Sequence, residues 1–400
     1  MSLNWRALAP HRPLAPGETG YVAPPSGFAE RIARQVAAGT STVLVTGPVG
    51  VGKSTELAHA ATLLHGTTHF ACLVQIDRKE NLRQLTAEQT LLRIAGSLGE
   101  SIGPNVSRDL RASLVEAGVI DQSFKSAAAA ASLKAMFPNA IPAPFRGSGR
   151  SLARAAIGEV ARLAPEGRVA LLLDGLEKLP EGPKAMEVLA ALAELGDEVD
   201  LVVVVPWFAA FGNSDEVIRP GAHIVPVPAC EVEGDPGEPG RRFLLDILAH
   251  RLGLPSEYFD PGTIVGTIST DIERAREDVT QRRALILDAA RWSGGLPRTF
   301  LQLIADAAQY AQIRRGDEWP QMQDLADAVA DQTDSYRRAL LPGDTKAIHQ
   351  VLGSDGREMA LDRKIRLLAR GIILERARGS AWSIDVHPLV RPLLGLAGHA

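Results

Sequence analysis

The sequence predicts an α/β fold in which a parallel sheet flanked by helices is followed by an all-helical segment and a small helix-and-strand module. Five short apolar runs, typical of buried strands, alternate with segments of helical periodicity. These runs are 42–45, 69–76, 169–174, 201–205 and 223–227. Because parallel strands need a long crossover between them, this alternation favours a parallel sheet.

Length and composition set the number of domains and the class of protein. A chain of 400 residues is too long for one core, so two or three domains are expected. The hydrophobic fraction of 46% is typical of globular proteins, and a net charge of −4 gives no reason to expect nucleic-acid binding. No apolar run reaches the roughly 18 residues that span a bilayer, and the polar start does not resemble a signal peptide. We therefore expect a cytoplasmic protein with no membrane contact and with reduced thiols at Cys72 and Cys230.

The segment from Gly47 to Thr55, GPVGVGKST, fits the P-loop pattern G-x-x-x-x-G-K-[ST] and follows the first apolar run. Its glycines let the backbone N–H groups surround phosphates, Lys53 places a cation on the β and γ oxygens, and Ser54 offers a hydroxyl to Mg²⁺. The sequence therefore predicts binding of ATP or ADP with Mg²⁺, against the alternative of a plain glycine-rich turn. The predicted nucleotide-binding residues here are Gly47, Pro48, Val49, Gly50, Val51, Gly52, Lys53, Ser54 and Thr55.

A second acidic site follows the apolar run 169–174, which ends in Asp174. A buried parallel strand delivers such a carboxylate to the edge of the sheet, where it can contact the metal. Glu177 could then polarise the attacking water. The alternatives are a strand-capping carboxylate for Asp174 and a solvated helix-start residue for Glu177. The run 69–76 lies between the two motifs in sequence, which favours the additional-strand class of P-loop ATPases over simple nucleotide kinases.

Changes in composition predict the domain boundaries. The proline-rich residues 1–26 predict an extended lead-in, and residues 27–232 predict the P-loop domain. An alanine- and proline-rich insertion at about 107–148 predicts either a helical hairpin or a mobile segment. A helical lid is expected at 241–315. At 325–400, helices followed by two short strands around a glycine turn predict a winged helix.

Two further sites lie outside the sheet. In the lid, Pro297 is preorganised for a helix start, so Arg298 can point back at the γ-phosphate, unless it is simply solvated. In the C-terminal module, Arg363, Arg366 and Arg370 share one helix face. This basic stripe is short and has no interleaved aromatic residues, so we expect a docking or solvated face and not a DNA reader.

Four motifs in this order resemble those of signal-transduction ATPases with numerous domains, the STAND branch of the AAA+-like P-loop NTPases. They are GPVGVGKST, LLLDGLEKL, GGLPR and VHPLVRPLL, and they resemble the Walker A, Walker B, GxP and MHD-type elements of NB-ARC and NACHT proteins. The resemblance implies that Pro297 packs on the nucleotide and that His387 reaches the ADP β-phosphate. A histidine that precedes a proline can equally be structural.

The chain also departs from the family pattern. Pro388 replaces the usual aspartate after the histidine, and Lys178 follows Glu177 in place of a second acid. The strand 201–205 lacks a polar sensor at its tip, which leaves Asn213 or Arg219 as substitutes. These departures imply slow hydrolysis, as in a switch whose ADP and ATP states differ in packing.

Three functions remain open at this stage. The favoured one is a STAND-like ATPase switch in regulatory or defence signalling, with a sensor or effector on a separate chain and the capacity for nucleotide-dependent homo-oligomers. The second is a DNA-binding AAA+-type ATPase that resembles origin-recognition or transposition helper proteins. The third is a structural nucleotide-binding partner without turnover.

Overall fold

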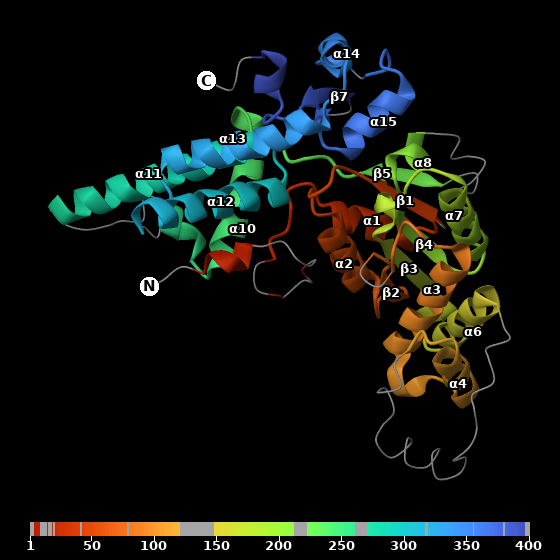
Figure 1. Ribbon diagram of the computed structural model, residues 1–400. Helices are drawn as coiled ribbons and strands as arrows, with labels where there is room; N and C mark the ends of the chain where they lie inside the picture. Colours follow the sequence, from red (N-terminus) through yellow and green to blue (C-terminus); the bar gives the residue numbers. More distant parts are fainter. Residues whose placement is uncertain are drawn as a thin grey trace. The chain divides into compact units, whose positions relative to one another are not determined.

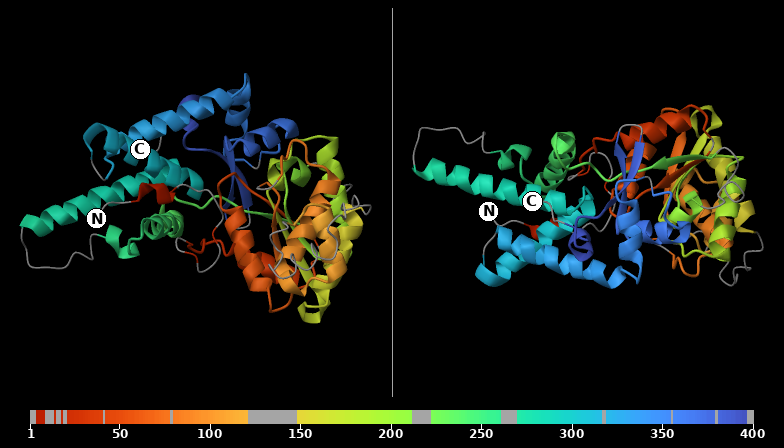
Figure 2. Two further views of the ribbon diagram at one scale, coloured as in Figure 1. Left: turned by 60° about the horizontal axis from the view of Figure 1, so that its bottom comes forward. Right: turned by 90° about the horizontal axis from the view of Figure 1, so that it is seen from above.

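In the computed structural model, the chain forms two compact units (Figures 1 and 2). The sheet unit comprises Ala29–Thr46 and His59–Val225, and the helical unit comprises Met1–Phe28, Gly47–Ala58 and Pro226–Ala400. The P-loop segment is thus grouped with the C-terminal half of the chain. The structure describes residues 4–8, 14, 18, 21–40, 42–77, 80–120, 148–211, 222–260, 270–316, 319–354, 356–378 and 381–396.

The sheet unit is built on a five-stranded sheet in the order β2-β3-β4-β1-β5, which confirms the predicted strands and the parallel sheet. The strands are β1 (Thr42–Thr46), β2 (Phe70–Gln75), β3 (Val169–Asp174), β4 (Asp200–Val204) and β5 (His223–Pro226). The extra strand β2 follows the P-loop strand in sequence, whereas β4 separates β1 from β3 in space. Both β1 and β3 are buried along their whole length, as expected for central strands covered on both faces.

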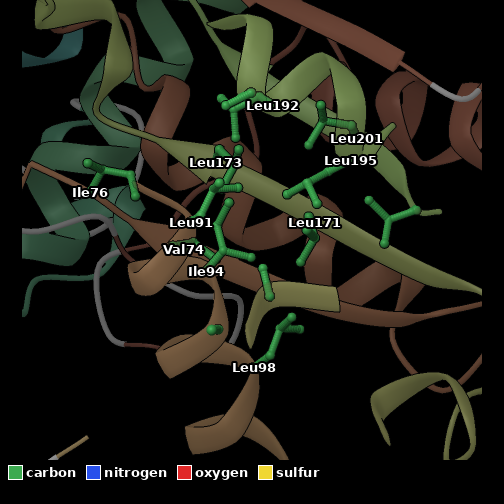
Figure 3. Packing of buried hydrophobic residues seen from close by; sticks show 14 of the residues in the cluster. Val74, Ile76, Leu91, Ile94, Leu98, Leu171, Leu173, Leu192, Leu195 and Leu201 are labelled. Carbon is green, nitrogen blue, oxygen red and sulfur yellow. The ribbon is translucent and has the colours of Figure 1, made fainter. Parts of the chain in front are cut away.

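Helices precede and connect these strands along the chain. They are α1 (Phe28–Ala37), α2 (Lys53–Leu64), α3 (Ala87–Ile102), α4 (Arg108–Glu116), α6 (Gly149–Ala161), α7 (Pro183–Leu195) and α8 (Trp207–Phe211), with short 3₁₀ turns η2 (Gly103–Asn105), η4 (Pro165–Gly167) and η5 (Leu176–Lys178). In Figure 1, α3, α6 and α7 lie on one side of the sheet. Figure 3 shows their core, where Ile94 and Leu98 of α3 and Leu192 of α7 pack with Leu171 and Leu173 of β3.

The start of the predicted insertion at 107–148 is ordinary domain structure. Ser107 caps α4 by accepting a hydrogen bond from the Leu110 N–H, and Leu110 and Leu114 are buried in the same core as α3 and α6. The alanine run 127–131 and the proline-rich stretch 138–144 lie outside the described residues.

The helical unit has its own core, formed by α10 (Glu238–Leu252), α11 (Thr270–Trp292), α12 (Pro297–Arg315) and α13 (Met322–Ala339). Helix α13 spans the expected start of the C-terminal module at 325, and its Leu325 and Ala328 share the core of the preceding helices. Short 3₁₀ turns are η6 (Asp235–Gly237) and η7 (Ser256–Phe259).

The N-terminal lead-in is not wholly extended, which corrects the expectation for 1–26. Residues Trp5–Leu8 form a 3₁₀ turn, η1, and Leu8 is fully buried in the core of the helical unit. The Trp5 ring packs edge-on against Trp319, with ring centroids 5.3 Å apart. Large apolar side chains therefore hold this segment in spite of its prolines.

The chain ends in α14 (Asp344–Val351), α15 (Leu361–Ala369), the antiparallel strands β6 (Ile373–Arg378) and β7 (Ala381–Val386), and η9 (Arg391–Leu394). The Asp344 side chain is buried and forms ion pairs with Arg366 and Arg363. Burial by itself raises the pKa of Asp344, but hydrogen bonds from Arg366 and the Leu341 N–H bring it below its ordinary value. Arg370 donates to the Ala339 carbonyl at 2.8 Å. The predicted basic stripe is therefore engaged in contacts within the chain.

Among the described residues, none of the helices combines the length and apolar character that crossing a bilayer requires. Cys72 and Cys230 are both free, as expected.

Candidate nucleotide site

The P-loop connects β1, which ends at Thr46, to α2, which begins at Lys53. Gly50 and Gly52 adopt φ values of +86° and +106°, a region that favours glycine. A Cβ atom at Gly52 would meet no protein atom within 4 Å, so the backbone there faces open space. A glycine loop that leads into the positive N-terminal end of a 12-residue helix is suited to binding phosphates.

Lys53 follows the P-loop in sequence, and its side chain contacts the backbone of that loop. Its side chain is buried, and Nζ donates hydrogen bonds to the carbonyls of Gly47 at 2.8 Å and Pro48 at 2.9 Å. These bonds hold the ammonium group over the loop. The Thr55 hydroxyl accepts a hydrogen bond from the Leu14 N–H at 3.4 Å, so the N-terminal segment also reaches the start of α2.

The acidic residues belong to the sheet unit. Asp174 is the last residue of β3 and only 3% exposed. Because the strands are parallel, it lies at the same edge of the sheet at which β1 ends. Glu177 lies on η5, and its Oε2 is buried without a hydrogen-bond partner among the described residues. Carboxylate and hydroxyl oxygens are the donors that Mg²⁺ prefers, and Asp174 of the sheet unit and Ser54 of the helical unit each offer one.

Arg298 approaches the P-loop within the helical unit. Helix α12 begins at Pro297, and the Arg298 N–H donates to the Gly50 carbonyl at 3.2 Å. A Cβ atom at Gly50 would lie 2.7 Å from the Arg298 Cβ, so only glycine permits this approach. The Arg298 side chain itself is exposed. The structure thus brings the predicted lid residue to the phosphate loop.

The loop before α12 packs tightly against two other segments of the helical unit. A Cβ atom at Gly295 would lie 1.8 Å from the Cys230 carbonyl oxygen, and the Cys230 N–H donates to the Gly295 carbonyl at 3.2 Å. A Cβ atom at Gly294 would lie 2.9 Å from Pro388, the neighbour of His387. The GGLPR motif therefore contacts the segment that carries the predicted histidine.

His387 is fully buried beside the Tyr336 ring, with ring centroids 5.0 Å apart. Burial, aided by the Arg376 guanidinium, lowers the pKa of His387 to about 3, so the ring is neutral near pH 7. Its Nδ1 accepts a hydrogen bond from the Leu389 N–H at 3.2 Å. A neutral imidazole that accepts at Nδ1 must carry its proton at Nε2. That Nε2–H is buried and has no acceptor among the described residues.

Arg376 belongs to none of the sequence motifs. This arginine of β6 is 3% exposed, donates from a terminal nitrogen to the Cys230 carbonyl at 3.0 Å and lies 3.5 Å from the Asp385 carboxylate. It joins the C-terminal hairpin to the backbone that supports the GGLPR motif. The substitute sensors Asn213 and Arg219 lie outside the described residues.

Two comparisons with known proteins gave a match. Residues 29–205 match a family model described as an AAA ATPase domain. Among solved structures, a Walker-type ATPase of Pyrococcus abyssi is similar over 98% of this chain and 100% of its own, with a TM-score of 0.52 and 12% identity, which shows likeness of fold. Among curated proteins no match was found. Together with the P-loop motif, the family match supports a P-loop ATPase domain of the AAA type over residues 29–205.

Proposed function

We propose that this protein is an ATP-dependent molecular switch of the STAND type, which hydrolyses ATP slowly and differs in packing between its ADP and ATP states. The observation that carries the proposal is the buried Nε2–H of His387, a donor without an acceptor among the described residues. The segment that carries His387 contacts the GGLPR loop. Arg298 of that loop donates a backbone hydrogen bond to the P-loop. A phosphate oxygen would satisfy the His387 donor and so couple nucleotide to the C-terminal module.

Each predicted residue then has a role. Lys53 binds the β and γ oxygens, Ser54 and Asp174 hold Mg²⁺, and Glu177 orients the attacking water. The bound metal neutralises charge on the phosphates. Pro297 packs on the nucleotide and Arg298 reads the γ-phosphate, both from the lid proposed at 241–315. His387 reads the β-phosphate from the winged helix proposed at 325–400.

The biological setting is part of the same proposal. We propose that the switch acts with a partner protein, a sensor or effector on another chain, and that it forms homo-oligomers in one nucleotide state. We place it in the cytoplasm, in regulatory or defence signalling, by resemblance to the STAND family. The DNA-binding alternative is not favoured, because Arg363 and Arg366 pair with the buried Asp344 and Arg370 donates to a carbonyl.

Replacement of His387 by alanine tests the proposal. Loss of one hydrogen bond to a charged group should speed release of a fluorescent ADP analogue about 10-fold to 100-fold, measured by stopped flow. The His387→Gln variant keeps an N–H donor and should recover part of the slow release.

The matched control is His250→Ala, an exposed histidine of α10 in the same unit, which should release ADP at the normal rate. Thermal unfolding checks that each variant is folded. Normal ADP release from folded His387→Ala would remove this histidine from the switch.

A further inference from the structure

We infer that Asp77 is a positioning residue, which holds the turn that carries Glu177 through contacts with both ends of that turn. The inference rests on the proposed role of Glu177 in orienting water. Neither the P-loop motif nor the family resemblance includes this residue, which follows the end of β2.

The register of the sheet unit brings Asp77 to the turn. Gln75 of β2 pairs with Asp174 of β3, and the Ile76 N–H donates to the Asp174 carbonyl at 3.0 Å, which extends the ladder past the strand end. Asp77 therefore lies beside the residues that follow Asp174. These residues are Gly175 and the 3₁₀ turn η5 (Leu176–Lys178).

Asp77 contacts the first residue of this segment and the last. At the first, a Cβ atom on Gly175 would lie 2.7 Å from the Asp77 carboxyl carbon, so the carboxylate packs directly against the glycine backbone. At the last, the Lys178 ammonium donates to Asp77 Oδ2 in an ion pair. Glu177 lies between these two contacts.

The turn needs such support. Gly175 has φ +95°, and a 3₁₀ helix of only three residues has little stability of its own. Leu176 is fully buried, so it fixes the turn to the core. Its burial does not determine the direction in which the next side chain, Glu177, points. The Oε2 of Glu177 is buried without a hydrogen-bond partner among the described residues, so its orientation is set by the backbone of the turn.

The solvent exposure of the Asp77–Lys178 ion pair indicates that the pair contributes little to folding stability. The side chains of Lys178 and Asp77 are 47% and 22% exposed, and ion pairs of that kind add little to stability. Small displacements of a catalytic group, in contrast, are costly for the rate. The pair should therefore matter for turnover much more than for unfolding.

The test is a double-mutant cycle with Asp77→Asn and Lys178→Gln, in which ATP turnover of the full chain is measured. Each single variant should lower kcat about 10-fold to 100-fold, while KM for ATP and the melting temperature stay close to wild type. The double variant should be no slower than the slower single variant, because both remove the same contact.

The matched control is the ion pair Arg150–Glu194 of the same unit, whose side chains are 47% and 49% exposed. The Arg150→Gln and Glu194→Gln variants should keep normal kcat. Normal kcat in Asp77→Asn, or independent additive losses in the cycle, would overturn the inference. The Glu177→Gln variant separates the role of Glu177 from that of Asp77. Normal turnover in Glu177→Gln would refute the proposed role of Glu177. Slow turnover in Glu177→Gln, with normal turnover in Asp77→Asn and Lys178→Gln, would refute only the positioning role of Asp77.

Discussion

Replacement of Lys53 by alanine should abolish measurable binding of ATP and ADP. Lys53 is buried, and its ammonium group is held over the loop by the Gly47 and Pro48 carbonyls, where it would meet the β and γ oxygens. Loss of a preorganised charged donor in a shielded site should weaken affinity at least about 100-fold, a change that isothermal titration calorimetry resolves.

The exposed Lys184 of α7 provides the matched control, since Lys184→Ala removes the same charge and should bind nucleotide normally. Circular dichroism would show whether the P-loop variant remains folded. Unchanged nucleotide affinity in Lys53→Ala would mean that the segment Gly47–Thr55 is only a glycine-rich turn.

Replacement of Glu177 by glutamine should nearly stop ATP turnover while nucleotide affinity is retained. The two side chains have the same shape, but an amide cannot accept the proton that a carboxylate takes from the attacking water. A loss of about 100-fold to 10,000-fold in kcat is expected for a general base, measured as phosphate release under saturating ATP.

The control is Glu181→Gln, an exposed residue that follows the same turn, which should hydrolyse ATP at the normal rate. Normal turnover in Glu177→Gln would assign the water-orienting role to another group. If the wild-type protein binds ATP and never hydrolyses it, the structural nucleotide-binding partner becomes the better description.

The sheet and the phosphate loop were predictable because their signals are local. Each central strand is a continuous apolar run, and the P-loop pattern lies between a strand and a helix in the required order. Phe28, Ile32 and Val36 also recur at helical spacing in the sequence, and all three are buried.

The contacts that surround the motifs were not predictable, because their partners are distant in sequence. Arg376 donates to a carbonyl 146 residues away, and an arginine is ordinarily expected at the surface. Asp77 pairs with a lysine 101 residues away. No periodicity encodes such pairs, so only the fold reveals them.

The packing of the N-terminal segment and of helix α15 was also not predictable from local sequence. The proline-rich start gave no sign that Trp5 and Leu8 would pack in the core of the helical unit. Trp319, which the Trp5 ring contacts, follows α12 and is distant in sequence. Helical spacing predicted one face for Arg363, Arg366 and Arg370, of which the first two lie in α15 and the third caps it. It could not show that the buried Asp344 of the preceding helix neutralises two of them.

The central claim is that nucleotide state is read outside the sheet, by the GGLPR loop and the segment that follows β7. Hydrogen–deuterium exchange of the wild-type protein, saturated with Mg²⁺ and either ADP or a non-hydrolysable ATP analogue, tests it most directly. We predict equal protection of Gly47–Thr55 by both nucleotides, but a difference at the two other segments. Residues 385–392 should exchange more slowly with ADP, which closes His387 on the β-phosphate, and residues 293–300 should exchange more slowly with the ATP analogue, which supplies the γ-phosphate for Arg298. Identical exchange of both segments in the two nucleotide states, with the P-loop protected in each, would contradict the account and leave an ATPase without this switch.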